Sequence, residues 1–398
     1  MITVATAENA LKNIYLDTVI NDINTKTNPF LSMIEKNAKV ASGKDAKVSI
    51  RSGNSAVGVG TESGDLPTTT NEKLIVISVP LKNLYGTFQI TDKALKTASL
   101  DPNAFASLLS GEMQNLVSAA QNNLTTMLYG NGKKLLCVFD KTALNEARTV
   151  ITTNARYIGN FTTGLSVIVY TPSGTKVSTT GATVTVNTSA KTLTLSSALT
   201  ANKADKYYVY AGIDDGTYMN GIDSVFEGSP YGIDLTANPD LAPYKFNEGS
   251  TTLEILNEDA VMDFMDNYEE HCQGNACDII LTHPVVKKAI FESLRDTRAN
   301  IGAAELAGGF RGFTFNGIPL YSDIKCKGGT LYALNSSSFA MHQLCDWSWL
   351  STDDGTILKQ QSGKPTYSAT LVKYAELICS KPFLQGKCSN YAANQWKA

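Results

Sequence analysis

Three histidines are the first candidates for chemistry in this sequence, and two cysteines accompany one of them. His271 and Cys272, followed by Cys277, suggest a zinc site, because imidazole and thiolate are ligands that suit this ion. However, the two cysteines are five positions apart, no second ligand pair follows nearby, and Cys272 lies on the apolar stripe of a predicted helix. We therefore interpret Cys272 as a core residue and predict no metal site.

The other two histidines lack the neighbours that catalysis needs. A Cys/His hydrolase requires a thiolate that an adjacent base activates, and no local signature of this kind occurs. His283 stands directly before Pro284, which is typical of the start of a helix, and His342 falls within a strand pattern. The sequence thus predicts packed histidines and no nucleophile–base pair.

Three short stretches resemble ligand-binding loops without matching them. Residues 130–134 (GNGKK) look like a phosphate loop, but Met127 stands where that motif has its first glycine, and Lys134 where it has Ser or Thr. Residues 58–64 space their glycines one residue too widely for a dinucleotide fingerprint. Residues 353–355 (DDG) carry too few acidic ligands for an EF-hand. We predict no catalytic residue and no cofactor, and hence a protein that is not an enzyme.

The composition excludes several further classes of protein. With 398 residues, 43% of them hydrophobic, the chain is expected to fold into two or three domains. Its net charge of −3 provides no basic field to hold nucleic acid, so any DNA contact is expected to be weak and non-specific. No secretory signal and no membrane-spanning apolar stretch is visible, which predicts synthesis in a cytoplasm. In that reducing compartment the seven cysteines are interpreted as small buried hydrophobic residues.

The first 40 residues are predicted to form an arm. Apolar residues from Leu11 to Ile23 recur at the spacing of an amphipathic helix, which Asn28 and Pro29 end. Phe30 then opens an apolar cluster that extends to Ile34 and needs a surface on which to pack.

A long hairpin follows the arm. Residues 47–51 predict a strand that enters a polar, glycine-rich segment at 52–71, and residues 73–90 return as a long β segment. A structureless loop of that length is unusual inside a compact domain. We interpret the segment as the tip of a projecting hairpin that another subunit orders; the alternative is a disordered surface loop.

The long helix after the hairpin is the clearest local pattern. Asp101 is a good N-cap, Pro102 suits the first helical position, and Gly130 suits the end. Apolar residues recur every three or four positions from Phe105 to Leu128. The helix would be a rod of roughly 40 Å, because each residue adds about 1.5 Å.

The remaining sequence changes character twice. Residues 149–200 are rich in Ser and Thr and alternate in hydrophobicity, so we predict a small all-β domain at about 135–213. It is interpreted as a structural insertion, with a sugar-binding or decorating module as the alternative. Mixed α/β patterns follow, with predicted helices at 251–274 and from Pro284, and strands at 278–282, 313–315, 318–320, 330–334, 339–344 and 367–379. Asn316-Gly317 is the signal of a type I′ hairpin turn.

Three stretches make this order of elements resemble a known family. They are residues 86–94 (GTFQITDKA) with the helix that runs on to 128–132 (LYGNG), residues 309–320 (GFRGFTFNGIPL), and residues 346–349 (DWSW) with Asp353, Gly355 and 362–364 (SGK). The chain resembles the major capsid proteins of tailed bacteriophages, which have the Hong Kong 97 type fold. Apart from the predicted β insertion, the resemblance covers most of the chain.

The resemblance implies an α+β capsid fold with named parts. These are an N-terminal arm at 1–40, a long β-hairpin E-loop at 41–98, a spine helix of the peripheral domain at 99–134, the inserted all-β domain at 135–213, an axial domain at 214–340, and return strands of the peripheral domain at 341–398. Residues expected at assembly interfaces are Glu62, Asp65, Lys73, Phe30, Trp347 and Trp349. Trp347 and Trp349 also fit an aromatic core cluster.

The implied function is a structural protein that self-assembles into an icosahedral or prolate phage head around double-stranded DNA. Its expected partners are copies of itself in pentamers and hexamers, a separate scaffolding protein, a portal protein, and decoration or head-completion proteins, without a membrane. Its expected location is the virion capsid, after synthesis in the bacterial cytoplasm. Two alternatives stay open: an encapsulin-like protein compartment, and a hydrolase or sugar-binding protein with a β binding module.

Overall fold

The chain divides into two units, which are described separately: residues 1–125 with 225–398, and residues 126–224. Four features predicted from the sequence lie outside the described residues. They are the helix at 11–23, the hairpin tip at 53–71 with Glu62 and Asp65, the capping residues at 251–257 and the loop at 353–355. The computed structural model describes residues 28–37, 41–42, 44–52, 73–98, 102–153, 158, 160–161, 163–171, 175–179, 181–200, 206–212, 218–246, 258–274, 277–296, 303–306, 310–327, 329–351 and 356–389.

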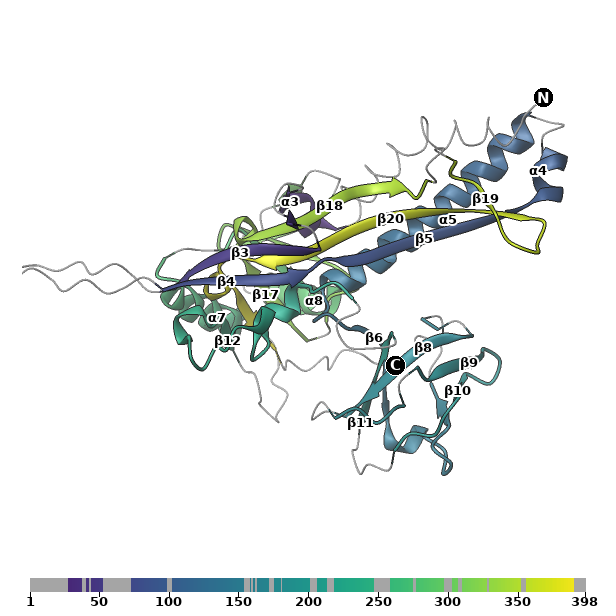
Figure 1. Cartoon of the computed structure of the whole chain (residues 1–398). Coiled ribbons are helices and arrows are strands. Elements are labelled where there is room, and N and C mark those ends of the chain that lie inside the picture. The colour runs from purple at the N-terminus through teal and green to yellow at the C-terminus, as the bar shows by residue number, and fades with distance from the viewer. Residues whose placement is uncertain are drawn as a thin grey trace, which may run out of the picture. The chain divides into compact units, whose positions relative to one another are not determined.

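One sheet of the larger unit is built around β20 (Thr366–Cys379). This strand pairs antiparallel with β18 (Phe339–Trp349) and with β5 (Lys82–Thr91), and β5, β18 and β20 appear as three long strands in Figure 1. The short strand β1 (Glu35–Asn37) joins β18 in parallel, and β19 (Lys359–Gln360) pairs with β20. The sheet therefore brings together segments from both ends of the sequence.

The long helix α5 (Pro102–Leu128) has the bounds that its sequence predicts. Within the larger unit its apolar residues Met113, Leu116 and Leu124 are buried. Leu116 packs against β5 at Gly86, where an added Cβ would lie 2.8 Å from the Leu116 Cδ1 atom. The glycine thus allows the helix and the sheet to approach closely.

The predicted β segment at 73–90 is two strands that belong to different sheets. β4 (Lys73–Pro80) pairs with β3 (Asp45–Ser52) over its whole length, and β2 (Ala41–Ser42) extends this small sheet. After Leu81 the chain enters β5 and pairs with β20 instead. The hairpin β3–β4 is therefore a separate ribbon, and the predicted β segment is divided between two sheets at Leu81.

The larger unit also contains a seven-stranded mixed sheet. Helix α7 (Glu258–His271) packs on it through Val261, Phe264 and Tyr268, which are buried with strand residues. Asn316 and Gly317 have positive φ angles of 47° and 79°, which confirms the type I′ turn between β15 and β16. The strands, in sheet order, are β12 (Tyr244–Phe246), β21 (Gly386–Cys388), β17 (Leu331–Leu334), β13 (Ile279–Thr282), β16 (Ile318–Ser322), β15 (Phe310–Phe315) and β14 (Ala303–Leu306).

Short helices complete the larger unit. α3 (Pro29–Met33) is capped by Asn28, whose side chain accepts a hydrogen bond from the Phe30 N–H. α4 (Asp92–Ala98) follows β5, and α8 (Pro284–Asp296) follows β13. The 3-10 helices of this unit are η4 (Pro230–Gly232), η5 (Pro239–Leu241), η6 (Ser336–Ser338) and η7 (Pro382–Leu384), and η3 (Ile222–Phe226) begins just before it.

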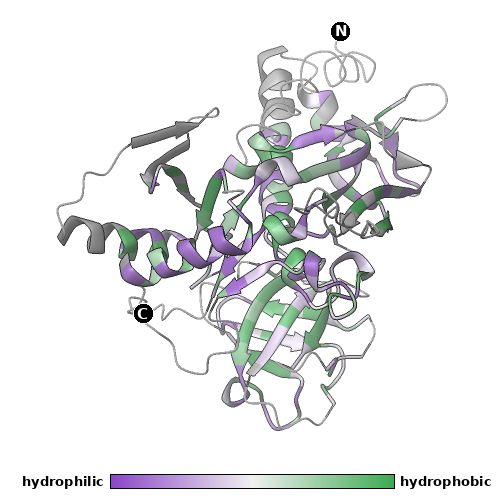
Figure 2. Ribbon diagram, turned by 90° about the vertical axis from the view of Figure 1, so that its left-hand side faces the viewer, coloured by the Kyte–Doolittle hydropathy of each residue, from purple (hydrophilic) through white to green (hydrophobic). Residues whose placement is uncertain are grey.

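Residues 126–224 form a unit with an antiparallel six-stranded sheet and a core of their own. Residues 183–187 and 192–195 alternate apolar with polar residues, and much of the length of the strands in this unit is green in Figure 2. Whether this unit is an insertion relative to the family fold stays a prediction, as do the boundaries 135 and 213. The sheet order is β6 (Lys134–Asp140), β11 (Lys206–Ala211), β8 (Leu165–Tyr170), β9 (Thr183–Asn187), β10 (Thr192–Leu195) and β7 (Val150–Thr152), and the 3-10 helix η2 (Lys141–Ala143) follows β6.

Candidate assembly surface and a buried ion pair

The inner face of the hairpin β3–β4 is attached to its own chain. In the antiparallel register Ala46 lies opposite Val79, and Ile50 lies opposite Ile75. Ala46, Ile50 and Val79 are buried, with Ile77, in a cluster that also contains Ile233, Leu241 and Ile378. Alternation in a strand places successive side chains on opposite faces, so the next residues in each strand point away from this cluster.

The outer face of the same hairpin exposes two large apolar side chains. Leu74 and Val76 stand two residues apart on β4 and keep 59% and 61% of their surface exposed. Beside them Lys47 lies opposite Ser78 in the register, and both are exposed. Burial of an exposed Val or Leu side chain is worth about 1.5–3 kcal/mol. This face is therefore a candidate contact surface for a second molecule.

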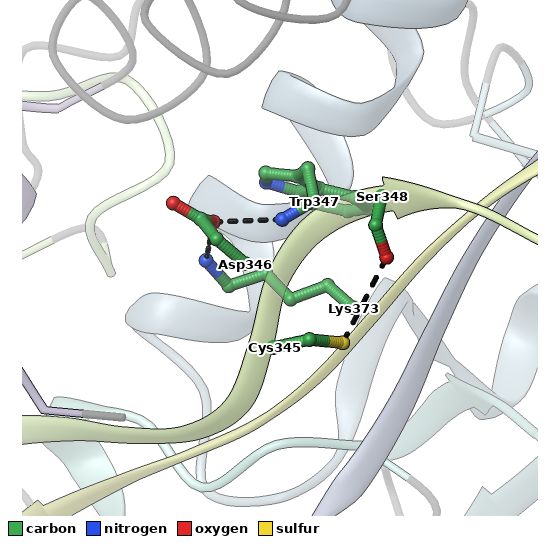
Figure 3. A network of polar contacts seen from close by, with 5 residues as sticks. All are labelled: Cys345, Asp346, Trp347, Ser348 and Lys373. Atoms are coloured by element: carbon green, nitrogen blue, oxygen red, sulfur yellow. Dashed lines mark hydrogen bonds and ion pairs between the residues drawn. The ribbon is translucent and has the colours of Figure 1, made fainter. Parts of the chain in front are cut away.

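The sheet around β20 shows the opposite arrangement, with charge inside (Figure 3). Lys373 of β20 is 0% exposed, and its Nζ atom lies 2.6 Å from the Oδ1 atom of Asp346 on β18. The same oxygen accepts a hydrogen bond of 2.8 Å from the Trp347 backbone N–H. The ammonium also lies 5.7 Å from the centre of the Trp347 ring. Asp346 thus holds the buried lysine and its own strand together.

Two ammonium groups, those of Lys36 and Lys373, interact with the single carboxylate of Asp346. Burial lowers the pKa of Lys373 from its ordinary value, and the Asp346 carboxylate opposes this shift. Burial and the Lys373 charge also lower the pKa of Lys36, which Asp346 again partly offsets. One carboxylate therefore compensates two ammonium groups. Its removal would leave a buried positive charge without an anionic partner at 2.6 Å.

Strand β18 departs from regular pairing at this point. Its register against β20 shifts between Gln343 and Cys345 and again between Cys345 and Ser348. Among the described residues, the Gln343 Oε1 and Trp347 Nε1 atoms are buried without a hydrogen-bond partner. A buried polar atom left unsatisfied costs about 1–3 kcal/mol. The bulged stretch is therefore held by its ion pair and apolar packing rather than by a complete hydrogen-bond ladder.

The residues predicted at assembly interfaces fall into two groups. Phe30 is buried and meets Phe339 edge-on at 5.1 Å between ring centres, and Trp349 meets Phe88 at 5.9 Å. Trp347 is buried as well. These three aromatic side chains are thus placed inside the chain, and their role at an interface stays a prediction. Lys73 begins β4, whereas Glu62 and Asp65 lie beyond the described part of the chain.

Apart from His342 and Cys345, which belong to β18, the histidines and cysteines lie outside the strand pair that holds the ion pair of Lys373 and Asp346. His283 is buried at the start of α8, where its Nδ1 atom accepts a hydrogen bond from the Val285 N–H, and His342 is buried in β18. Burial raises the pKa of Cys272 to about 11 and that of Cys277 to about 12, which describes inert core thiols. The described residues hold no group of three or more potential metal ligands, and none of their helices could cross a membrane.

The ion pair of Lys373 and Asp346 was not predicted from the sequence. One signal was available: residues 371–379 (LVKYAELIC) form an otherwise apolar strand in which a lysine and a glutamate have no obvious reason to occur. Lysine and glutamate are almost never fully buried unless they are paired. The partner itself could not be identified, because it lies 27 residues away in sequence.

No protein-family model matches the sequence, and no curated protein matches it significantly. Solved structures do match. A chain from the capsid asymmetric unit of cyanophage A-1(L) is similar over 96% of this chain and 94% of its own, with a TM-score of 0.56 and 11% identity. The chain has the major capsid protein fold of tailed bacteriophages. The predicted α+β, Hong Kong 97 type fold class is thereby confirmed.

Two further structures extend the comparison at lower similarity. The capsid of an empty GTA particle aligns with 92% of the chain and 90% of its own, at a TM-score of 0.48 and 11% identity. The holo-SrpI encapsulin complex from Synechococcus elongatus PCC 7942 aligns with 94% of the chain and 91% of its own, at a TM-score of 0.44 and 8% identity. Both values lie below that of the cyanophage capsid, on which the fold assignment rests.

Proposed function

We propose that this chain is the major capsid protein of a tailed bacteriophage and that it self-assembles into an icosahedral or prolate head around double-stranded DNA. The observation that carries the proposal is the capsid fold, which extends over 96% of the chain. In this function the protein acts by association and not by catalysis. Its location is then the virion capsid.

Each segment takes a part in this assembly. Residues 1–40 act as an arm, 41–98 as the E-loop and 99–134 as the spine helix. Residues 214–340 act as the axial domain, which meets its copies at fivefold and sixfold positions, and 341–398 return to the peripheral domain. The extent of α5 and the separate ribbon β3–β4 support these assignments. The role of 135–213 as an inserted domain belongs to the same proposal.

The physical driving force is the sum of many modest contacts. An isolated subunit leaves Leu74 and Val76 exposed on its hairpin. Each copy that joins a pentamer or hexamer can bury such a face, and a closed shell links every contact to several others. Ordering of arms and loops opposes association, so it occurs only when a neighbour supplies the compensating contacts.

The partners follow from the same function. A separate scaffolding protein guides assembly, a portal protein occupies one vertex, and decoration or head-completion proteins add to the finished shell. DNA is enclosed without a specific binding site, which agrees with the net charge of −3. Glu62, Asp65 and Lys73 are proposed to contact neighbouring subunits near the hairpin tip.

Electron microscopy of the purified chain tests this function. We expect uniform closed shells, either from the chain alone or after coexpression with a scaffolding protein. Monodisperse monomers under all of these conditions would overturn the proposal. Shells that enclose a cellular enzyme instead of DNA would assign the same fold to a cellular compartment.

A further inference from the structure

The hairpin β3–β4 passes into the sheet around β20 through a single residue. Leu81 alone stands between the end of β4 at Pro80 and the start of β5 at Lys82. Its backbone N–H donates a hydrogen bond of 3.0 Å to the Lys44 carbonyl at the base of the hairpin. Because β4 and β5 belong to different sheets, the register of neither sheet fixes the direction of the hairpin. Packing at the base of the hairpin has this task.

The packing comes from residues 230–241, which we call the seat of the hairpin. Ile233 and Leu241 of the seat are buried in one cluster with the inner face of the hairpin. The 3-10 helix η4, at the start of the seat, lies against β4. Within the seat the Asn238 N–H donates a hydrogen bond of 3.1 Å to the Asp234 carbonyl. The direction of the hairpin therefore depends on how the seat itself is held.

Tyr231 fastens the seat to the strand β20. Its hydroxyl accepts a hydrogen bond of 3.1 Å from the Cys379 N–H and donates one of 3.4 Å to the Leu377 carbonyl. Both backbone groups lie beyond Ala375, the last residue of β20 that pairs with β5. The phenol thus serves as a hydrogen-bond partner where β5 no longer does. Cys379 is fully buried, so water does not replace this contact.

The backbone of Tyr231 is held in an unfavourable conformation. Its φ and ψ angles of 52° and 24° lie in the left-handed region, which disfavours residues that have a Cβ atom. Such a conformation persists only where the surroundings impose it, and it is typical of functional positions. Here the constraint comes from the two contacts of the hydroxyl and from the packing of the ring against the hairpin cluster.

We propose that Tyr231 is the positioning residue of the hairpin: through the seat, it sets the direction in which the outer face with Leu74 and Val76 is presented. This inference rests on the proposed capsid function, in which every copy presents this face to its neighbours. Contacts that must form at several places at once are lost when the geometry prevents their simultaneous engagement. A hairpin that is folded but misdirected therefore impairs the shell more than it impairs the subunit.

Tyr231→Phe tests the hydroxyl, because it keeps the ring and removes both contacts with β20. The matched control is Tyr268→Phe, which removes another phenol contact, the hydrogen bond of 2.8 Å to the Leu384 carbonyl in the core beneath α7. Amide exchange and urea unfolding are measured on free subunits, and shells are counted by electron microscopy. We expect Tyr231→Phe to speed exchange in β3 and β4 about tenfold and to lower the yield of regular shells at least fivefold. Tyr268→Phe should change neither, although its unfolding midpoint falls at least as far.

Tyr231→Gly provides a second test, since glycine accepts the left-handed backbone but removes the ring as well. Exchange in β3 and β4 should then be faster than in Tyr231→Phe. Unchanged exchange in both Tyr231 variants, or equal shell yields from Tyr231→Phe and Tyr268→Phe, would overturn the positioning role and leave the capsid function intact. Loss of the folded subunit in Tyr231→Phe would also overturn it, because the hydroxyl would then stabilise the whole unit. Failure of the unaltered chain to form shells would instead overturn the capsid function.

Discussion

The hairpin β3–β4 and the strand pair β18–β20 arrange their side chains in opposite ways. The hairpin exposes Leu74 and Val76 to solvent, whereas the strand pair buries Lys373 completely. Apolar exposure has no benefit for an isolated subunit. The ion pair joins the buried Lys373 to the Asp346 side chain, which is 32% exposed, so desolvation of the lysine opposes the Coulomb energy of the pair. The strand pair supplies the partner of its buried lysine within one chain, whereas the hairpin face is proposed to meet a second molecule.

The comparison also separates two kinds of mutational effect. Changes to Lys373 or Asp346 should act on the free energy of unfolding, since both partners of this ion pair belong to the same chain. Changes on the outer hairpin face should act on association and leave the subunit nearly as stable as before.

Asp346→Asn should destabilise the subunit by about 3 kcal/mol, because loss of one partner leaves a buried charge uncompensated. The midpoint of urea unfolding, followed by tryptophan fluorescence, measures this effect. Asp263→Asn on the exposed face of α7 is the matched control and should change stability by less than about 0.5 kcal/mol. Equal midpoints for the two variants would contradict the structural role of the ion pair.

The two faces of the hairpin should respond differently to similar truncations. Ile77→Ala removes buried methyl groups and should destabilise the hairpin by about 2 kcal/mol. Val76→Ala, on the neighbouring position of the same strand, should cost less than about 0.5 kcal/mol. Hydrogen exchange of the β3 and β4 amides measures the loss of stability in each variant. Equal losses of protection would show that the outer face is also packed within the chain.

Shell formation should respond in the opposite way, with the larger effect from a change on the outer face of the hairpin. Val76→Asp places a charge on the face that is proposed to dock and should lower the shell yield, while the free subunit keeps its unfolding midpoint. Electron microscopy and urea unfolding of the same preparation provide the two measurements. A variant that assembles normally would remove this face from the assembly surface.

Lys373 should also give stability a distinctive dependence on pH. Its folded-state pKa lies below the ordinary value of 10.5. Between these two values the unfolded chain binds more protons, so stability contributed by this group rises with pH and is lost as pH falls through the folded-state pKa. The buried Cys137 and Cys379 act in the opposite sense, because their pKa values are raised to about 12.

The contribution of Lys373 to the pH dependence of stability is therefore measured as a difference between the unaltered protein and a variant without the lysine. Unfolding midpoints of the unaltered protein and of Lys373→Met are compared between pH 7 and pH 10. We expect the unaltered protein to gain stability relative to the variant as the pH rises. A constant difference over this range would show that the burial of Lys373 does not shift its pKa.

The smallest expected effect concerns the accessibility of thiols. Six of the seven cysteines are buried, and Cys345 in the bulged stretch of β18 is half-buried. In the folded subunit a thiol reagent should therefore modify Cys345 before the others, and Cys345→Ser should abolish this first phase. The absorbance of the released thiolate follows the reaction. A fast phase that persists in Cys345→Ser would place the most accessible thiol elsewhere.

The sequence by itself determined the elements whose signals are local. The bounds of α5 follow from Pro102, the apolar spacing and Gly130, because capping and helix periodicity act within a few residues. The type I′ turn at Asn316 and Gly317 follows in the same way, since both residues tolerate a positive φ. The strands at 183–187 and 192–195 are predicted for the same reason, because their alternation of apolar and polar residues is a local pattern.

The tertiary structure alone decided which strands pair and which charges meet. The division of 73–90 after Leu81 depends on the competition of β3 and β20 for pairing, and β20 lies nearly 300 residues further along the chain. The ion pair of Lys373 and Asp346 needs the register of β18 on β20, including both bulges. Local sequence carries no information about such partners, because their energies arise only when distant segments are packed together. The exposure of Leu74 and Val76 is decided in the same way, since alternation alone cannot tell which face of a ribbon its own chain will cover.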